Sequence, residues 1–254
     1  MKHLLSCLFI LSVLPFLDRP LEVERQEWVI QHMRGDIPSE EFDIGVTVDI
    51  PISGNPFLVD SVVHLLNESL YYYFEGSNDT RFSPEALYCP DGKRLLQRYQ
   101  EAYKPYIEDT CEFHGGCPDF FVYLSVTMKE QTESFVTYEV SNYFIGEGDF
   151  EYLEWVTFDK NDGHRLAKII DDVKVPELLK ITFGTDYDVW EDAEYRLSKD
   201  DEVAWRCSFG LTSDSLQCQY LYAPGIVETF SLGLESVKPY LTKEAAELCR
   251  LLRE

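Results

Sequence analysis

Residues 134–170 constrain the fold more than any other part of the chain, because they read as two strands joined by a tight loop. In residues 135–140 apolar and polar side chains alternate, which places one set on each face of a strand. Gly146 and Gly148 follow, and glycine tolerates the backbone angles of a sharp reversal. Residues 150–158 are rich in aromatic and β-branched side chains and predict the returning strand. This stretch therefore predicts an antiparallel hairpin.

The hairpin is followed by a turn and a short helix. Residues 159–163 read Asp-Lys-Asn-Asp-Gly, which is turn chemistry. Leu166, Ile169, Ile170 and Val173 then recur at the spacing of one helical face, which predicts a short helix.

The rest of the chain predicts an α+β fold. Asn55 and Pro56 are typical of a helix start, and a second helix over residues 91–106 is predicted to end at Pro105. Residues 21–39 are polar and irregular, with a possible short edge strand near Trp28. Thr242 is predicted to cap a last helix. Alternation predicts further strands over residues 42–50, 120–128, 203–211, 216–222 and 230–234. We expect an antiparallel meander sheet with helices packed on it, in two successive α/β subdomains.

The charge of the chain limits its partners. With 46 acidic and 22 basic residues the formal net charge is −24. Such a surface repels phosphate backbones and anionic lipid head groups, which argues against nucleic-acid binding. It favours a cationic partner, and the alternative, which is the simpler interpretation, is an acidic surface that only keeps the protein soluble. Hydrophobic residues make up 45% of the chain, a globular composition.

The first residues predict export. A basic start precedes an apolar run over residues 4–17, which is typical of a secretory signal peptide within residues 1–20. The run is too short for a membrane-spanning helix, which needs about 20 residues. A buried first strand is the alternative. The expected location is the periplasm or the cell surface.

Cysteine usage agrees with export. Without Cys7, which lies in the signal, six cysteines remain, and an even number in an exported chain suggests disulfides. The first candidate bridge would close a small loop that contains His114. The second would cross the predicted hairpin of residues 203–222. The third pair consists of the two cysteines that remain. The three candidate pairs are Cys111–Cys117, Cys207–Cys218 and Cys89–Cys249. Zinc at the loop is a weaker hypothesis, and six buried thiols are the alternative.

No catalytic motif is found in the sequence. It contains no nucleophile elbow, no phosphate-binding loop, no His-Glu-x-x-His and no three-glycine dinucleotide fingerprint. Residues 159–163 lack the spacing of a calcium loop. The sequence therefore indicates a binding protein more than an enzyme, with no cofactor or metal expected.

Two segments resemble a known family. The runs SNYFIGEGDFEYLEWVTFDKNDGHRL (residues 141–166) and FGLTSDSLQCQYLYAPGIVETFSLGLESVKPYL (residues 209–241) resemble the exported domain named for the bacterial anti-sigma factor RsiV. Residues 42 to about 106 are similar to its companion domain, which also occurs in PdaC-type deacetylases outside their catalytic domain. The resemblance divides the chain into a companion domain over residues 40–118 and an RsiV-like domain over residues 119–254.

The resemblance implies an extracytoplasmic domain of unknown function. In the anti-sigma factor the corresponding region is a sensor that binds lysozyme. We therefore expect a binding or sensing module for a cationic protein such as lysozyme, or for a cell-wall ligand. Where the family usually has Gly-Gly-Ala-His-Gly, this chain has Gly-Glu-Gly-Asp at residues 146–149, so a role of that histidine is not expected here.

The candidate ligand-binding residues lie at and beside this loop: Glu147, Asp149, Tyr143 and Trp155. A carboxylate-dependent hydrolase of cell-wall glycan, using Glu147 and Asp149, is the first alternative, because glycosidases use two carboxylates. A structural envelope protein is the second.

Overall fold

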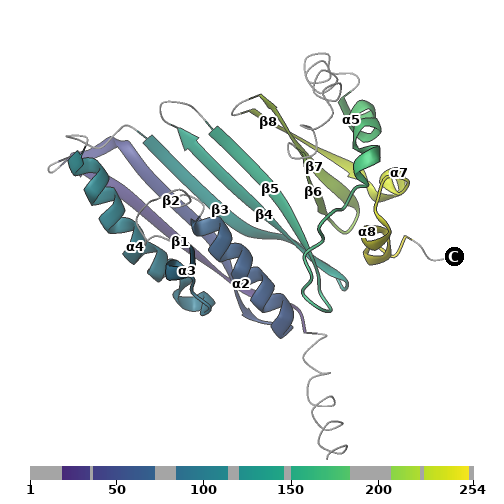
Figure 1. The fold of residues 1–254 in the computed structure, drawn as a ribbon, viewed down its shortest axis with the longest axis horizontal. Coiled ribbons are helices and arrows are strands. Elements are labelled where there is room, and N and C mark those ends of the chain that lie inside the picture. Colours follow the sequence, from purple (N-terminus) through teal and green to yellow (C-terminus); the bar gives the residue numbers. More distant parts are fainter. Residues whose placement is uncertain are drawn as a thin grey trace, which may run out of the picture. The chain divides into compact units, whose positions relative to one another are not determined.

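The computed structural model describes residues 19–34, 37–71, 84–113, 120–145, 150–183, 207–223 and 226–251. The described chain forms two compact units (Figure 1). The N-terminal unit contains the described residues up to Thr127 together with Lys160–His164, and the C-terminal unit contains Met128–Asp159 and the described residues from Arg165.

Strands and helices occur in separate runs along the chain, as expected for the predicted α+β class. The strands are β1 (Glu22–Arg34), β2 (Ile37–Ser53), β3 (Phe120–Gln131), β4 (Phe135–Ile145), β5 (Phe150–Asp159), β6 (Cys207–Leu211), β7 (Ser215–Ala223) and β8 (Ile226–Gly233). The helices are α2 (Pro56–Tyr71), α3 (Pro84–Leu87), α4 (Gly92–Phe113), the 3₁₀ turn η3 (Asp172–Lys174), α5 (Val175–Phe183), α7 (Leu234–Val237) and α8 (Lys243–Leu248). Hydrogen bonding orders the strands β1-β2-β3-β4-β5 and β6-β7-β8. None of these described helices is long and apolar enough to cross a membrane.

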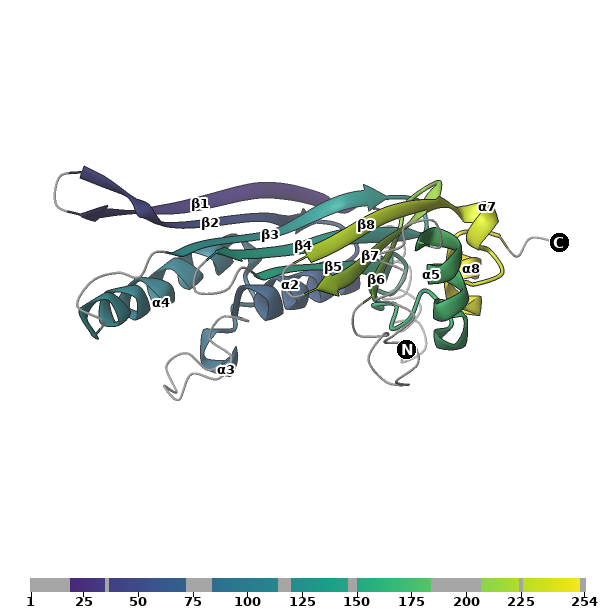
Figure 2. The ribbon, with the colours of Figure 1, turned by 90° about the horizontal axis from the view of Figure 1, so that it is seen from above.

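In the N-terminal unit two helices cover one face of the strands. Val46, Val48 and Ile50 of β2 alternate as predicted and are at most 2% exposed. Figure 2 shows α2 and α4 on the same side of β1 and β2. The sheet is mostly antiparallel, as predicted, and β2 and β3 pair in parallel. A parallel pair needs a long crossover connection, and the helical segment between these strands provides it.

Strand β1 is a missed element. The sequence predicts an irregular segment with a short edge strand, whereas 13 residues pair antiparallel with β2. Its polar side chains find partners there. Arg25 makes two hydrogen bonds of 2.8 and 2.9 Å to the buried carboxylate of Asp49, and the Trp28 ring meets Tyr99 edge-on with centroids 5.7 Å apart.

The start of α2 is confirmed at Pro56, and Asn55 does more than cap it. The Oδ1 atom of Asn55 accepts from the backbone N–H of Phe57 at 3.0 Å. Its Nδ2 atom donates to the carbonyls of Lys160 and Asn161 at 2.9 and 2.7 Å. Asn55 is fully buried. One side chain therefore joins the helix start to the turn predicted after β5, which is present.

The predicted end of the second helix is wrong. Helix α4 continues through Pro105 to Phe113, so Cys111 lies in a helix and not in the expected loop. Proline removes one helical hydrogen bond at a cost of about 3 kcal/mol. Burial of Leu95, Leu96 and Tyr99, each at most 3% exposed, offsets that cost.

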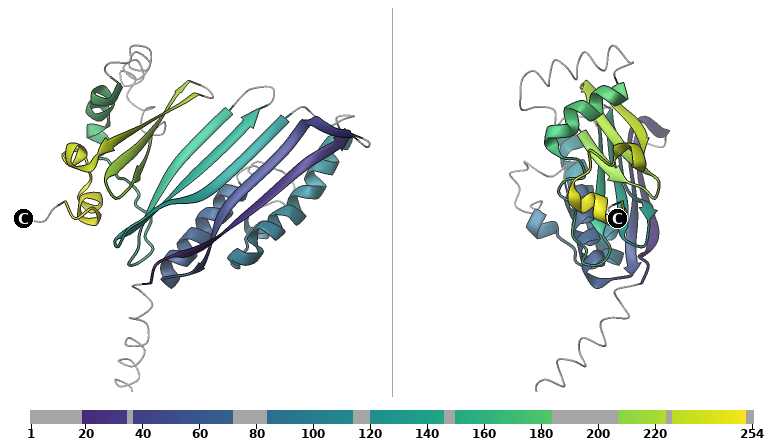
Figure 3. Two further views of the ribbon diagram at one scale, coloured as in Figure 1. Left: turned by 180° about the vertical axis from the view of Figure 1, so that it is seen from behind. Right: turned by 90° about the vertical axis from the view of Figure 1, so that its right-hand side faces the viewer.

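In the C-terminal unit, β4 and β5 form the predicted hairpin, with Thr137 opposite Thr157. Figure 3 shows α5, α7 and α8 beside the three-stranded sheet β6–β8. Helix α8 starts as predicted, because the Thr242 hydroxyl accepts from the backbone N–H of Ala245 at 3.3 Å. Its apolar residues share one buried core with the sheet, which includes Leu178, Leu179, Leu211, Leu216, Tyr220, Val237 and Ala245.

The short helix predicted from Leu166 to Val173 is wrong. Residues 165–170 are not helical: the chain bends at Ala167 and Ile169 and forms single β-bridges from Arg165 to Phe158 and from Ile170 to Leu241, and the 3₁₀ turn η3 begins only at Asp172. The backbone N–H of Leu166 donates to the Thr157 carbonyl at 2.9 Å. The helical spacing misleads because Val173, at the end of the apparent stripe, is 81% exposed. The backbone of residues 165–170 makes hydrogen bonds to other segments of the chain in place of the hydrogen bonds within a helix.

The predicted register of the β6–β7 hairpin is also wrong, by two residues. Cys207 lies opposite Tyr220, and Cys218 lies opposite Phe209. The turn decides the register, because the N–H of Thr212 bonds the Ser215 carbonyl at 2.8 Å.

The four described cysteine side chains are thiols. Cys89, Cys207, Cys218 and Cys249 are free in the structure, in place of the predicted bridges Cys207–Cys218 and Cys89–Cys249. Cys117 lies outside the described residues, so the Cys111–Cys117 bridge stays a prediction.

Candidate ligand-binding cavity

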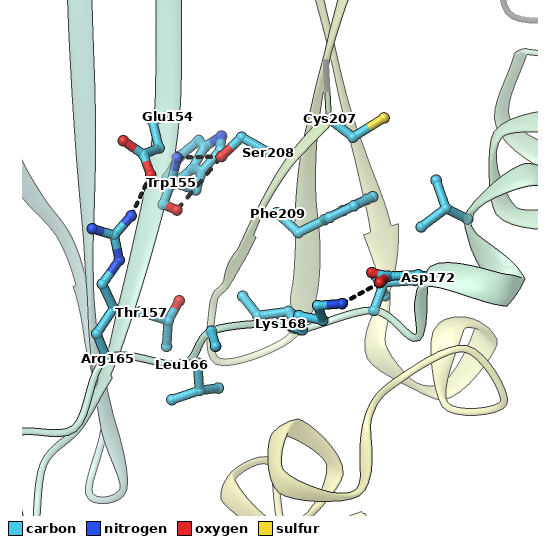
Figure 4. A pocket seen from close by; sticks show the side chains of 14 residues that line it. Glu154, Trp155, Thr157, Arg165, Leu166, Lys168, Asp172, Cys207, Ser208 and Phe209 are labelled. Atoms are coloured by element: carbon cyan, nitrogen blue, oxygen red, sulfur yellow. Dashed lines mark hydrogen bonds and ion pairs between the residues drawn. The ribbon is translucent and has the colours of Figure 1, made fainter. Parts of the chain in front are cut away.

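The C-terminal unit contains a cavity of about 280 Å³ (Figure 4). Its walls come from β5, from β6 and from the chain segment that leads to η3 and α5. The lining residues are Glu154, Trp155, Thr157, residues 165–170, Asp172, Val175, Cys207, Ser208 and Phe209.

Close packing of β6 on Trp155 fixes one side of the cavity. A Cβ atom on Gly210 would lie 2.7 Å from the Trp155 Cβ, so only glycine allows this approach. Beside it, the Ser208 hydroxyl accepts from the backbone N–H of Trp155 at 2.6 Å. The backbone of β5 is thus held by a side chain of β6.

Two buried hydroxyls also join β6 to the β4–β5 hairpin. Thr137 and Thr157 are at most 1% exposed, and their Oγ1 atoms are 2.9 Å apart. Thr137 donates to the carbonyl of Leu211 at 2.7 Å, and the Leu211 N–H donates to Thr157 at 3.3 Å. Every backbone polar group of Leu211 is therefore paired where the strands meet.

Gln219 holds the indole of Trp155. This side chain is 2% exposed. With the amide oriented to match its neighbours, its nitrogen donates to the Leu153 carbonyl at 2.6 Å and its oxygen accepts from the Trp155 indole N–H. The indole is thereby fixed at the cavity wall.

Two ion pairs flank the cavity. Arg165 pairs with Glu154, and Lys168 pairs with Asp172. Figure 4 shows the two pairs on opposite sides of the space, with the Phe209 side chain between them. All four side chains are between 27% and 59% exposed, so both pairs are accessible to a ligand.

The floor of the cavity is apolar. Leu166, Ile169, Ile170 and Val175 are each at most 6% exposed and belong to the core, and Phe209 packs against them. A ligand would therefore meet an apolar floor with charges of both signs at the sides.

The thiol at the cavity is not poised for chemistry. Burial raises the pKa of Cys207 to about 12, because the thiolate is poorly solvated there. The thiol stays protonated at neutral pH, and the thiolate is the form that attacks or binds metals. Among the residues that the structure describes, no group of three or more His, Cys, Asp or Glu side chains is placed to hold a metal ion.

The structure separates the predicted ligand-binding residues. Trp155 lines the cavity. Tyr143 is on the same face of the hairpin but pairs with Glu151, four register positions away, and is 37% exposed. Glu147 and Asp149 lie outside the described residues, so their predicted role is untested.

Sequence reasoning missed most of the cavity. Ser208 and Phe209 join residues 154–172 through packing between distant segments, which no local pattern encodes. One signal was present, since Gly210 interrupts an alternating strand, and such a glycine often marks close approach of another chain segment.

Comparison with known proteins identifies the fold and no more. No protein-family model matches the sequence, and no curated protein matches it. The structure is similar to that of a DUF3298 family protein from Pseudomonas aeruginosa PAO1, with a TM-score of 0.56 and 14% identity, covering 90% of this chain and 98% of that one. It is also similar to a DUF3298 family member from Bacteroides fragilis, with a TM-score of 0.57 and 12% identity, covering 92% and 99%.

These similarities define a class by its architecture. The chain has the fold of these DUF3298 structures along nearly their whole length. The fold is compatible with the RsiV-type resemblance seen in the sequence.

Proposed function

We propose that the chain is an extracytoplasmic binding or sensing module of a bacterial envelope, which captures a cationic protein such as lysozyme, or a cell-wall ligand. The cavity of the C-terminal unit is the observation that carries this proposal. It has an apolar floor, an aromatic wall at Trp155 and accessible ion pairs on two sides. Such a mixture is typical of ligand sites.

The net charge of −24 supports a cationic partner, because opposite charges steer association. The apolar run at the start of the sequence supports export. The protonated thiol of Cys207 supports binding over covalent chemistry at this cavity.

The test measures binding of hen lysozyme to the purified protein by calorimetry, at salt concentrations from about 0.05 to 0.5 M. Ala167 is exposed and lines the cavity, so Ala167→Trp should obstruct it without disturbing the core. Ala86 is also exposed but belongs to the N-terminal unit, so Ala86→Trp is the matched control.

We expect binding that weakens with salt, is lost in Ala167→Trp and is retained in Ala86→Trp. Equal binding by both variants would reject the cavity as the site. Failure to bind lysozyme and peptidoglycan fragments alike would reject the function.

A further inference from the structure

One wall of the cavity is the outer edge of a β-strand. Among the strands that the structure describes, β6 lies at the end of the order β6-β7-β8. The bond from Thr212 to Ser215 makes these residues a hydrogen-bonded pair. Pairs alternate in an antiparallel ladder, so Leu211, Phe209 and Cys207 are in non-hydrogen-bonded positions. Their backbone N–H and C=O groups therefore point away from β7.

The neighbouring edge groups are already used within the unit. The backbone C=O and N–H groups of Leu211 bond to the hydroxyls of Thr137 and Thr157. On β5, the N–H of Trp155 bonds to Ser208 and the carbonyl of Thr157 accepts from Leu166. The next outward position on β6 is Phe209, and this residue lines the cavity.

Residues 165–170 form the opposite wall. The N–H of Leu166 and the carbonyl of Ile169 are bonded to Thr157 and Thr242. Between them Ala167 is exposed and lines the cavity. The space therefore lies between the edge of one strand and a second chain segment, and a strand edge is where an extended peptide can add.

We propose that the occupant of the cavity is an extended segment of a partner protein, which adds as a strand beside β6 and places one apolar side chain over Phe209. This inference rests on the proposed binding function and selects a protein ligand over a glycan. In strand addition, backbone bonds at the exposed edge provide affinity and alternate side chains provide specificity.

The charges around the cavity indicate which side chains the bound segment should carry on either side of its apolar residue. In a strand, residues two positions apart lie on the same side, roughly 6.6 Å from each other. Basic residues two positions before and after the apolar one would reach toward Glu154 and Asp172 on the two sides (Figure 4). Their present partners, Arg165 and Lys168, are 44% and 59% exposed and can turn to solvent at small cost.

The test uses a synthetic fluorescent peptide, acetyl-Lys-Val-Leu-Val-Lys-amide, and fluorescence anisotropy. Three further peptides carry an N-methyl group on one of the central residues in turn. Strand addition uses the N–H of alternate residues only, so methylation should weaken binding about tenfold at alternate positions and leave the position between them unchanged. Glu154→Gln combined with Asp172→Asn should weaken binding about tenfold and reduce its salt dependence. Ala167→Trp should abolish it, and Ala86→Trp should not change it.

Equal affinity for all four peptides would overturn strand addition. If lysozyme binding were at the same time blocked by Ala167→Trp, the proposed function would stand without this inference. Binding of chitin pentasaccharide at the cavity, with no peptide bound, would overturn the inference in favour of a glycan. If the folded wild-type protein binds neither lysozyme nor the peptide, both the inference and the proposed function are rejected.

Discussion

A single added methyl group at Gly210 should destabilise the C-terminal unit and disturb the cavity wall. In Gly210→Ala the new Cβ would lie 2.7 Å from the Trp155 Cβ and 2.9 Å from two atoms of its indole. Ordinary carbon contacts are about 3.5–4.0 Å, so one of the two strands must move by about 1 Å. Because Gln219 accepts from the indole N–H, Trp155 cannot turn away without losing that bond.

The expected cost follows from these contacts. Overpacking in a formed core costs about 1–3 kcal/mol. Weakening of the indole hydrogen bond adds about 0.5–1.5 kcal/mol. Replacing glycine in a strand returns about 0.5–1 kcal/mol of backbone entropy. The net loss in the free energy of unfolding is therefore about 1–3 kcal/mol.

The measurement is urea unfolding followed by tryptophan fluorescence and circular dichroism, with Gly233→Ala as the control. No atom lies within 4 Å of a Cβ on Gly233. In Gly233→Ala the smaller entropy of the unfolded chain is stabilising, whereas alanine is a weaker cap of α7 than glycine. These effects oppose each other, so the free energy of unfolding of this control should stay within about 0.5 kcal/mol of wild type. Equal stability of the two variants would refute the close packing of β6 on Trp155.

Three more predictions concern single side chains. Asn55→Ala should lower the free energy of unfolding by about 2–5 kcal/mol in urea, since a cap and two buried hydrogen bonds are lost. Asn55→Asp keeps the cap acceptor but sets a buried carboxylate oxygen against the two carbonyls, so it should cost at least as much, and near-wild-type stability of Asn55→Asp would contradict the assignment. Arg25→Met should lower the free energy of unfolding, because the buried Asp49 carboxylate loses two hydrogen bonds, whereas Glu27→Gln on the exposed side of the same strand should change it less, and an equal effect of the two variants in urea unfolding would contradict the pairing. At pH 8 iodoacetamide should label Cys207 about a thousandfold more slowly in the folded protein than in urea, because folding raises the pKa of the thiol from 9.0 to about 12. The stability that the protonated Cys207 thiol contributes should be lost as the pH rises from about 9 to about 12. Rapid labelling of Cys207 in the folded protein, measured by mass spectrometry, would contradict its burial.

Local patterns predicted those elements whose stabilising contacts lie near them in sequence. Asn55 and Pro56 marked the start of α2 correctly, because a cap and a proline act within one helical turn. The hairpin of β4 and β5 followed from alternation and two glycines. Strand β1 was missed because its polar residues gain their partners only from β2, for example Arg25 from Asp49.

Patterns failed where distant segments compete for the same backbone. Leu166, Ile169 and Ile170 carry helical spacing, yet they form no helix. The N–H of Leu166 bonds to Thr157 and the carbonyl of Ile169 bonds to Thr242 instead. The cavity belongs to this second group. Trp155 could be named from the sequence as an aromatic residue near a loop, whereas Ser208 and Phe209 reach it only through the stacking of β6 on β5.

The bond between Asn55 and the carbonyl of Lys160 spans 105 positions in the chain. A ribosome adds about 5–20 residues per second, so Asn55 is made roughly 5–20 s before its acceptor exists. During that time the first turn of α2 has its cap but not its anchor. The N-terminal unit, though most of it is synthesised first, must complete its folding only after β3, β4 and β5 have been made. A nascent chain stalled before residue 160 should therefore remain open to proteases at α2, and one stalled after residue 164 has emerged should not.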